Sequence, residues 1–379
     1  MLDNEFQKEA TRCLGCKVKP CQKACPLGVS PTDFIKAAKE NDFKGAASEI
    51  THKNPLPQTC GLVCPDRFCQ KVCIRAKMDQ AIAIPCLQAE IIKRGGYQPL
   101  ALPQNIGKKA AIVGGGPAGI GACYAFLMSG WSVDIYEAQN ELGGAARLIP
   151  EYRLAHQVLD NEIRRIVENE RVKVFLGTRV DDFHALKAQY DGVVLALGEP
   201  MSRKLGIVGE EYCVPFTEYL SNPTKFKGMK ICVTGGGEVA LDCAMTAKKC
   251  GADTVEMFVR RRKSDMRIMA RDQEELAKTG VYVRELSSVV KIKQEGKKFD
   301  LDVISNRIND EGKAEAKLGT EHALYGYDMV IQALGAYYPK DKIPENFVIA
   351  GDMTGVCGTV VQALASGKAA AQRVMEENA

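Results

Sequence analysis

After Cys73 the sequence has no Cys-x2-Cys or Cys-x4-Cys pair, the arrangement that enzymes acting on disulfides need. Disulfide reduction is therefore disfavoured. We also expect no secretory signal, because the sequence opens with the charged stretch Met1-Leu-Asp-Asn-Glu, and the 15 cysteines are an odd number. These features favour a reducing cytoplasm over secretion, where cysteines are usually paired.

Long uncharged stretches are scarce as well. Residues 110–133 carry no formal charge over 24 positions, a length that could cross a membrane. Five glycines lie within 114–121 of this stretch, which suits a strand, a turn and a helix better than a lipid-facing helix, so we expect no membrane span. The charged fraction of 26% and hydrophobic fraction of 46% exclude disorder and coiled coil, and 379 residues suffice for two or three domains.

Eight cysteines near the start form two mirrored quartets. The first reads Cys13-x2-Cys16-x4-Cys21-x3-Cys25-Pro, and the second reads Cys60-x3-Cys64-Pro-x3-Cys69-x3-Cys73. Short gaps place thiolates around a cubane, and a proline directly after a cysteine is typical of bacterial ferredoxin motifs. The spacing predicts two iron–sulfur clusters and electron transfer. A zinc-binding interaction module is the alternative, although zinc sites usually repeat one closed four-ligand spacing.

The chain changes character near residue 105. Helical stretches such as 31–41 and 81–93, set among loops of Cys, Pro and Gly, indicate a small helical domain over residues 1–105. Residues 94–108 have three glycines, two prolines and no periodicity, which is typical of a linker. Two strand–turn–helix–strand patterns follow. The first has expected strands over 109–113 and 132–136 with a helix over 119–129, and the second has expected strands over 230–234 and 254–259 with a helix over 239–250. We expect a flavin-binding domain over 106–225 and 336–379, interrupted by a nicotinamide-binding domain over 226–335.

The first pattern contains a dinucleotide-binding loop, Gly114-Gly-Gly116-Pro-Ala-Gly119. Its glycines let the backbone approach a pyrophosphate at a helix N-terminus. Glu137 ends the next expected strand, 18 residues after Gly119, where an acidic side chain hydrogen-bonds an adenosine ribose. The alternative is that the glycines form only a tight turn.

The second loop reads Gly235-x-Gly237-x-x-Ala240, and its following strand ends in Arg260-Arg261-Arg262. An acidic residue there would repel a 2′-phosphate, whereas arginines pair with one, so NADPH is favoured over NADH. Arg267 could add a contact. The alternative is that the arginines form a solvated surface loop.

Three later segments complete the nucleotide domains. Residues 191–198 and 328–335 repeat one another, each an apolar strand that leads into a small-residue turn. Residues 346–352 then place an apolar strand before Gly351-Asp352, and a helix is expected from Thr359. This pattern suits a carboxylate that reaches a flavin's ribityl chain while the helix N-terminus faces the flavin ring.

These motifs together resemble the flavoproteins with two dinucleotide-binding domains. With the cysteine region in front, the chain resembles the small subunit of bacterial glutamate synthase and, equally, the amino-terminal half of dihydropyrimidine dehydrogenase, from residue 13 to about 370. The resemblance implies an α/β fold of two nested Rossmann-like domains, for FAD and NADPH, preceded by a helical domain with two [4Fe-4S] clusters.

The resemblance also implies that the two quartets exchange members. One cluster would be held by Cys13, Cys16, Cys21 and Cys73, and the other by Cys25, Cys64, Cys69 and Gln88. Gln88 lies in Ile84-Pro-Cys-Leu-Gln, and Pro85-Cys86 departs from the family's pattern. Cys60 and Cys86 would then be spare, whereas spacing alone would use Cys60, so Gln88 and Cys60 stay the candidates for the fourth ligand of the second cluster.

For the nucleotides, the resemblance implies the following contacts. FAD would be bound by Gly114, Gly116, Pro117, Ala118, Gly119, Glu137, Gly143, Gly144, Arg153, Gly351, Asp352 and Thr359. NADPH would be bound by Gly235, Gly237, Glu238, Val239, Ala240, Arg260, Arg261 and Arg267. No side chain is expected to act as an acid or base in hydride transfer, and Arg153, which could otherwise be a surface residue, is the one catalytic candidate.

The implied function is electron input: NADPH is oxidised through FAD and the clusters, and the electrons pass to a catalytic partner subunit or a ferredoxin. Because the sequence ends at residue 379 without a second catalytic domain, we expect a hetero-oligomer. A dihydropyrimidine dehydrogenase-type subunit, a ferredoxin:NADP oxidoreductase and a bifurcating transhydrogenase subunit are alternatives to the glutamate synthase type. The net charge of +4 does not indicate nucleic acid, because clusters and FAD would bring the loaded protein near neutrality.

Overall fold

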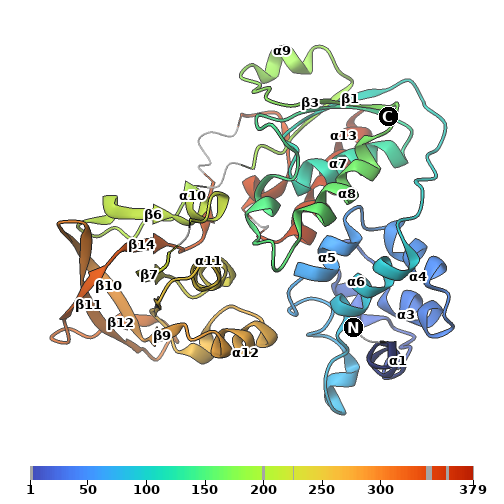
Figure 1. The fold of residues 1–379 in the computed structure, drawn as a ribbon. Helices are drawn as coiled ribbons and strands as arrows, with labels where there is room; N and C mark the ends of the chain where they lie inside the picture. The colour runs from blue at the N-terminus through green and yellow to red at the C-terminus, as the bar shows by residue number, and fades with distance from the viewer. Residues whose placement is uncertain (1–2, 199–200, 225, 339–343, 356–357, 379) are drawn as a thin grey trace. The chain divides into compact units, whose positions relative to one another are not determined.

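The computed structural model describes residues 3–198, 201–224, 226–338, 344–355 and 358–378. The chain forms two compact units, coloured along the sequence in Figure 1. The first comprises Met1–Arg147, Glu151–Glu199 and Tyr338–Ala379, and the second comprises Leu148–Pro150 and Pro200–Tyr337. The chain therefore leaves the first unit, builds the second and returns.

The amino-terminal region of the first unit is helical. Its elements are α1 (Asp3–Thr11), α2 (Pro20–Ala24), α3 (Pro31–Lys39), α4 (Phe43–Thr51), α5 (Pro57–Val63), the 3-10 helix η1 (Ile74–Lys77) and α6 (Ile84–Gly95). Proline begins α2, α3 and α5, because the first turn of a helix needs no N–H donor and favours the proline φ. Phe6, Phe34, Ile35, Ile50 and Leu87 are almost fully buried in its core.

A five-stranded parallel sheet in the order β16-β4-β1-β2-β3 forms the rest of the first unit. Its strands are β1 (Lys109–Val113), β2 (Ser132–Tyr136), β3 (Val172–Phe175), β4 (Gly192–Leu195) and β16 (Val348–Ile349). Its helical elements are α7 (Pro117–Met128), η2 (Gly144–Leu148), α8 (His156–Val167), α9 (Phe183–Lys187), η6 (Gly351–Thr354) and α13 (Val360–Glu377). Strand β16 belongs to the first sheet but follows the second unit in the sequence. The nested order expected from the sequence is therefore confirmed.

The second unit repeats this architecture with a parallel sheet in the order β6-β14-β7-β8-β9. The strands are β5 (Met201–Ser202), β6 (Cys213–Pro215), β7 (Lys230–Thr234), β8 (Thr254–Val259), β9 (Tyr282–Glu285), β10 (Ser287–Glu295), β11 (Lys298–Ile308), β12 (Ala314–Ala316), β13 (His322–Tyr327), β14 (Met329–Gln332) and β15 (Ala336–Tyr337). The helical elements are η3 (Glu210–Tyr212), α10 (Phe216–Ser221), α11 (Glu238–Lys249), η4 (Lys263–Asp265) and α12 (Ala270–Lys278). An antiparallel sheet of β10 to β13 packs on its core through Leu301, Val303 and Tyr327.

The uncharged stretch 110–133 forms most of β1, the loop, α7 and the start of β2. Gly121 and Gly367 allow α7 and α13 to pack closely, since a Cβ at these positions would lie 2.3 Å from the Leu364 carbonyl and 1.8 Å from the Ala118 carbonyl. No helix in the described ranges is long and apolar enough to span a membrane.

The helical region and the first sheet's helices share buried polar contacts. The Tyr124 hydroxyl on α7 donates to the carbonyls of Thr51 (3.1 Å) and His52 (2.9 Å). The Glu162 carboxylate on α8 accepts the backbone N–H groups of Gln58 (2.5 Å) and Thr59 (2.9 Å) at the start of α5. These contacts join the two regions, which fall in one compact unit. The domain limits at 105, 225 and 335 stay predictions.

Candidate functional site

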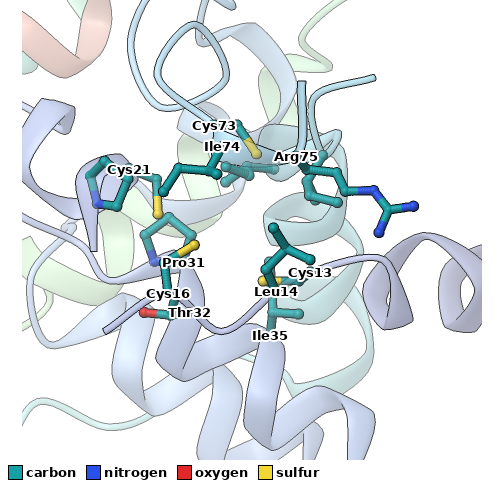
Figure 2. A pocket seen from close by; sticks show the side chains of 13 residues that line it. Cys13, Leu14, Cys16, Cys21, Pro31, Thr32, Ile35, Cys73, Ile74 and Arg75 are labelled. Carbon is teal, nitrogen blue, oxygen red and sulfur yellow. The ribbon is translucent and has the colours of Figure 1, made fainter. Parts of the chain in front are cut away.

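Four cysteines from both quartets line one pocket of about 350 Å3. Cys13, Cys16 and Cys21 come from the first quartet, and Cys73 comes from the far end of the second. Figure 2 shows their sulfur atoms around one space, with Leu14, Ile35 and Ile74 as apolar walls and the Arg75 guanidinium pointing away. This first cysteine pocket contains the ligand set that the resemblance implies for one cluster.

A second cysteine pocket, of about 400 Å3, holds the remaining candidates. Cys25, Cys64, Cys69 and Gln88 line it, and so does Cys60. Cys60 lies in α5 with only 1% of its surface exposed, and Gln88 lies in α6 with 8% exposed. The structure thus brings together both candidates for the fourth ligand.

The Gln88 amide has a fixed orientation in this pocket. Its Nε2 atom donates to the carbonyl oxygen of Pro57 at 2.7 Å, and a carbonyl can only accept, which identifies the amide end that faces Pro57. The Oε1 atom makes no hydrogen bond with a described residue. Gln88 therefore has an oxygen left to act as a neutral ligand.

Burial makes several of the pocket thiols poor acids by themselves. Burial raises the pKa of Cys21 to about 11 and that of Cys69 to about 12. A hydrogen bond with Cys60, together with burial, raises the pKa of Cys64 well above its usual value. Thiolates here need nearby positive charge, which iron ions supply. Among the described residues, no three His, Cys, Asp or Glu side chains converge closely enough to hold a single metal ion, whereas the cysteines surround pockets.

The two pockets share a wall, and one of them touches the sheet region. Ile84, at the start of α6, lines both pockets and is 3% exposed. Val361, in the first turn of α13, lines the second cysteine pocket. The second pocket therefore lies between the first pocket and the N-terminal turn of α13.

The first glycine loop is shaped for close backbone approach. A Cβ on Gly119 would lie 1.9 Å from the Gly114 carbonyl, and one on Gly114, whose φ is +107°, would lie 2.1 Å from the Ala196 carbonyl. Gly116 is the N-cap of α7, where Pro117 and Ala118 begin the helix. The buried Glu137 carboxylate accepts the N–H groups of Gly115 (2.6 Å) and Gln139 (2.8 Å), which holds it at the end of β2. This cradle fits the adenosine and pyrophosphate of a dinucleotide.

The other expected flavin contacts gather around this cradle. Gly143 donates its N–H to the Gly115 carbonyl at 2.9 Å, and a Cβ on Gly144 would lie 2.9 Å from the Gly116 Cα. A Cβ on Gly351 would lie 2.9 Å from that of Ala118, which puts η6 beside the N-terminus of α7.

Two polar residues lie close to the start of α13. Thr359 is the N-cap of that helix and accepts the Gln362 N–H at 3.3 Å. Burial raises the pKa of the Asp352 carboxyl. Arg153 is half-buried in the turn before α8, and its role stays a prediction.

The second glycine loop leaves more open space at the N-cap of its helix than the first loop does. A Cβ on Gly235 would lie 2.2 Å from the Ala333 carbonyl and 3.0 Å from the Ala240 Cβ, which repeats the tight strand–helix approach. Gly237, the N-cap of α11, has nothing within 4 Å of the place where a Cβ would be. Glu238 and Val239 follow it at the start of α11, and the Glu238 carboxylate accepts the Met269 N–H at 3.1 Å.

The arginines lie at the edge of this loop. Arg260 and Arg261 directly follow β8, and the Arg267 N–H donates to the Gly236 carbonyl at 3.1 Å. Arg260 and Arg267 are exposed, and none of the three forms an ion pair with a described residue. Three unpaired guanidinium groups beside a dinucleotide loop fit an anionic group on the nucleotide.

Comparisons with known proteins agree with this geometry. Residues 108–348 match the family described as pyridine nucleotide-disulphide oxidoreductase, and residues 1–95 match dihydropyrimidine dehydrogenase domain II, 4Fe-4S cluster. The chain belongs to the pyridine nucleotide-disulphide oxidoreductase family. It is an NAD(P)H-dependent oxidoreductase of the class that contains FAD and iron–sulfur clusters, as the motifs predicted.

Two relatives match a larger part of the chain than residues 108–348. The NAD-dependent dihydropyrimidine dehydrogenase subunit PreT homolog of Salmonella typhi is 31% identical, over 97% of this chain and 93% of its own length. The glutamate synthase [NADPH] small chain of Mycobacterium tuberculosis is 28% identical, over 68% of this chain and 58% of its own length. Both families that the sequence resembles are thus confirmed as relatives.

A solved structure supports the fold. Mycobacterium tuberculosis FprA in complex with NADPH has a TM-score of 0.60 at 18% identity, over 71% of this chain and 84% of its own. At this identity the likeness concerns the fold alone, and it covers less of the chain than the Salmonella relative does.

Sequence reasoning missed three residues of this site. Ile84 and Val361 line the cysteine pockets although their own types carry no cofactor signal, and only their positions near Gln88 and Thr359 hinted at them. Glu162, fully buried on α8, was missed because its partners are backbone N–H groups about 100 residues away.

Proposed function

We propose that this oxidoreductase is the electron-input subunit of a larger complex, which oxidises NADPH and delivers single electrons to a partner protein. The observation that carries the proposal is the position of the second cysteine pocket, between the first pocket and the first turn of α13. Such a chain of pockets provides a route from the flavin region to the molecular surface. When bound, FAD supplies the conversion of a two-electron hydride into single electrons, and the clusters supply one-electron carriers.

We assign Cys13, Cys16, Cys21 and Cys73 to the first pocket's cluster, and Cys25, Cys64, Cys69 and Gln88 to the second. The free Oε1 of Gln88 supports the second assignment, because its Nε2 is occupied by the Pro57 carbonyl. Burial of Ile84 between the pockets keeps water from the space that separates them. Cys60 remains the competing ligand.

The nucleotide sites follow from the two glycine loops. The cradle around Gly114, Gly119 and Glu137 would hold FAD, and Asp352 and Thr359 would face its ribityl chain and ring. The more open loop at Gly237 would hold the nicotinamide dinucleotide. The unpaired Arg260, Arg261 and Arg267 favour NADPH, although the Salmonella relative is named NAD-dependent.

Two partner classes follow from the relatives' names. The Salmonella relative, which matches nearly the whole chain, is named a dihydropyrimidine dehydrogenase subunit, and the Mycobacterium relative is named a glutamate synthase small chain. Native purification under anaerobic conditions, with identification of co-eluting proteins, tests this part. A pyrimidine-reducing subunit or a glutamine-using synthase subunit would support the proposal, and a protein that elutes alone would contradict it.

A further inference from the structure

Large apolar side chains gather at the surface around the first cysteine pocket. Leu14 (45% exposed) and Val18 (63%) lie in the loop between α1 and α2, and Val72 (40%), Ile74 (36%) and Met78 (68%) lie in or beside η1. Single exposed apolar residues are ordinary, but several that flank one pocket mark an interaction site. We call these five residues the apolar rim.

The two segments of the apolar rim form one surface. Leu14 and Ile74 line the same pocket, as Figure 2 shows. Polar contacts join the segments beside it, because Arg12 donates to the Asp79 carboxylate at 3.0 Å and Arg75 donates to the Arg12 carbonyl at 3.5 Å. Leu14 and Ile74 thus lie at the pocket in which Cys13, Cys16 and Cys73 are partly exposed, and Val18, Val72 and Met78 lie within four residues of them along the chain.

The same surface carries positive charge. Residues 13–23 and 67–78 contain lysines and arginines but no aspartate or glutamate. Two of the nearby acidic groups are already paired, Asp33 with Lys19 at 2.6 Å and Asp79 with Arg75 at 2.7 Å, whereas Asp66 forms no ion pair with a described residue. Lys17, Lys71 and Lys77 are exposed and form no ion pair with a described residue.

We propose that the apolar rim, with Lys17, Lys71 and Lys77, is the docking surface for an electron-carrying protein that has acidic residues around its own one-electron centre. This inference rests on the proposed function, since it names where electrons leave and which charge the acceptor bears. Apolar contact beside the pocket brings the two redox centres close, while unpaired lysines attract an acidic partner and speed its encounter. Transient redox complexes typically have small interfaces.

The number of electrons that NADPH releases determines how the assay is designed. Oxidation of one NADPH to NADP+ releases one proton and two electrons, so it reduces two molecules of a one-electron acceptor. Rubredoxin serves as the acidic acceptor, cytochrome c as the basic acceptor, and menadione as a small neutral one. The test variant is K17E/K71E/K77E. The control is K44E/K173E/K297E, which changes the charge equally at exposed lysines on α4, on β3 and between β10 and β11.

At low ionic strength we expect the test variant to lose at least about tenfold in kcat/KM for rubredoxin and to gain for cytochrome c, with both effects fading as salt is added. Menadione reduction and iron content should stay unchanged, and the control variant should differ little from the wild type. The proposal would be overturned by equal losses in both variants or by an unchanged rate with rubredoxin. It would also be overturned if the wild type bound single-stranded RNA and the test variant lost that binding while it kept its turnover of rubredoxin. A wild type that cannot reduce menadione with NADPH would instead contradict the proposed function.

Discussion

The amide nitrogen of Gln88 on α6 is hydrogen-bonded to the carbonyl oxygen of Pro57, the first residue of α5, at 2.7 Å. Pro57 has no N–H, and its carbonyl holds the amide so that Oε1 remains available in the second cysteine pocket. Glu162 in turn holds the start of α5 by accepting two of its backbone N–H groups. The pocket is thus organised by helices from both parts of the first unit.

The Gln88→Cys substitution should lower the reduction potential of the second cluster. A thiolate in place of a neutral amide oxygen adds negative charge, which stabilises the oxidised form, so a shift on the order of 100 mV is expected. Redox titration followed by electron paramagnetic resonance measures this shift. Cys60→Ala is the matched control from the same pocket and should leave potential and iron content unchanged. Loss of a cluster in Cys60→Ala, with no effect in Gln88→Cys, would make Cys60 the ligand.

Glu162 should make stability depend on pH. Burial raises its pKa to about 7, above the value near 4.5 expected in the unfolded chain. A raised folded-state pKa means that Glu162 contributes stability below about pH 4.5 and that this contribution is lost as pH rises towards 7, by about 3 kcal/mol in full. Urea unfolding of the anaerobic protein between pH 5 and 8 should therefore show a steeper decline in the wild type than in Glu162→Gln. Parallel curves for the two proteins would refute this account.

Arg260 and Arg261 should determine the preference between nicotinamide nucleotides. Charge-assisted hydrogen bonds contribute about 1.5 to 3 kcal/mol each, so R260A/R261A, which removes two of them, should raise the KM for NADPH by at least about 100-fold while the KM for NADH changes little. Steady-state kinetics with menadione measure both. The neighbouring exposed Arg262 offers the control, and Arg262→Ala should alter neither constant. Equal effects on NADPH and NADH would count against recognition of a 2′-phosphate.

The two glycine loops should respond differently to an added methyl group. Gly119→Ala would put a Cβ 1.9 Å from the Gly114 carbonyl, so α7 must shift and the flavin content of the purified protein should fall. Gly237→Ala adds its Cβ to open space, so the fold and flavin content should persist while the KM for the nicotinamide nucleotide rises. Flavin absorbance and kinetics distinguish these results, and normal flavin content in Gly119→Ala would contradict the fit of the first loop.

The sequence predicted the nucleotide-binding strands well because short apolar runs were bounded by glycine loops. The bounds of β1, β2, β7 and β8 agree with the expected ones. α7 begins at Pro117 rather than Gly119, and α11 at Glu238 rather than Val239, because both helices begin directly after the second glycine of the loop.

Other features were not predicted from the sequence, because they depend on contacts between residues that are far apart along the chain. The strand expected before Gly351-Asp352 is limited to Val348–Ile349, and Gly351, with a φ of +77°, begins a 3-10 turn. The long hairpins β10 to β13 were not predicted, and neither was Glu162, whose burial follows from packing between α8 and α5. The exchange of cysteines between quartets came from the family resemblance, since spacing alone favoured two four-cysteine sites.

The central claim, that NADPH delivers electrons through a flavin to two clusters, is tested most directly on the anaerobically purified protein. Iron and acid-labile sulfide analysis, followed by electron paramagnetic resonance before and after addition of NADPH, is the measurement. We predict about eight iron and eight sulfide atoms per chain, bleaching of the flavin absorbance, and new signals from reduced clusters. Zinc in place of iron and sulfide, or a bleached flavin with no cluster signal at any applied potential, would contradict the claim.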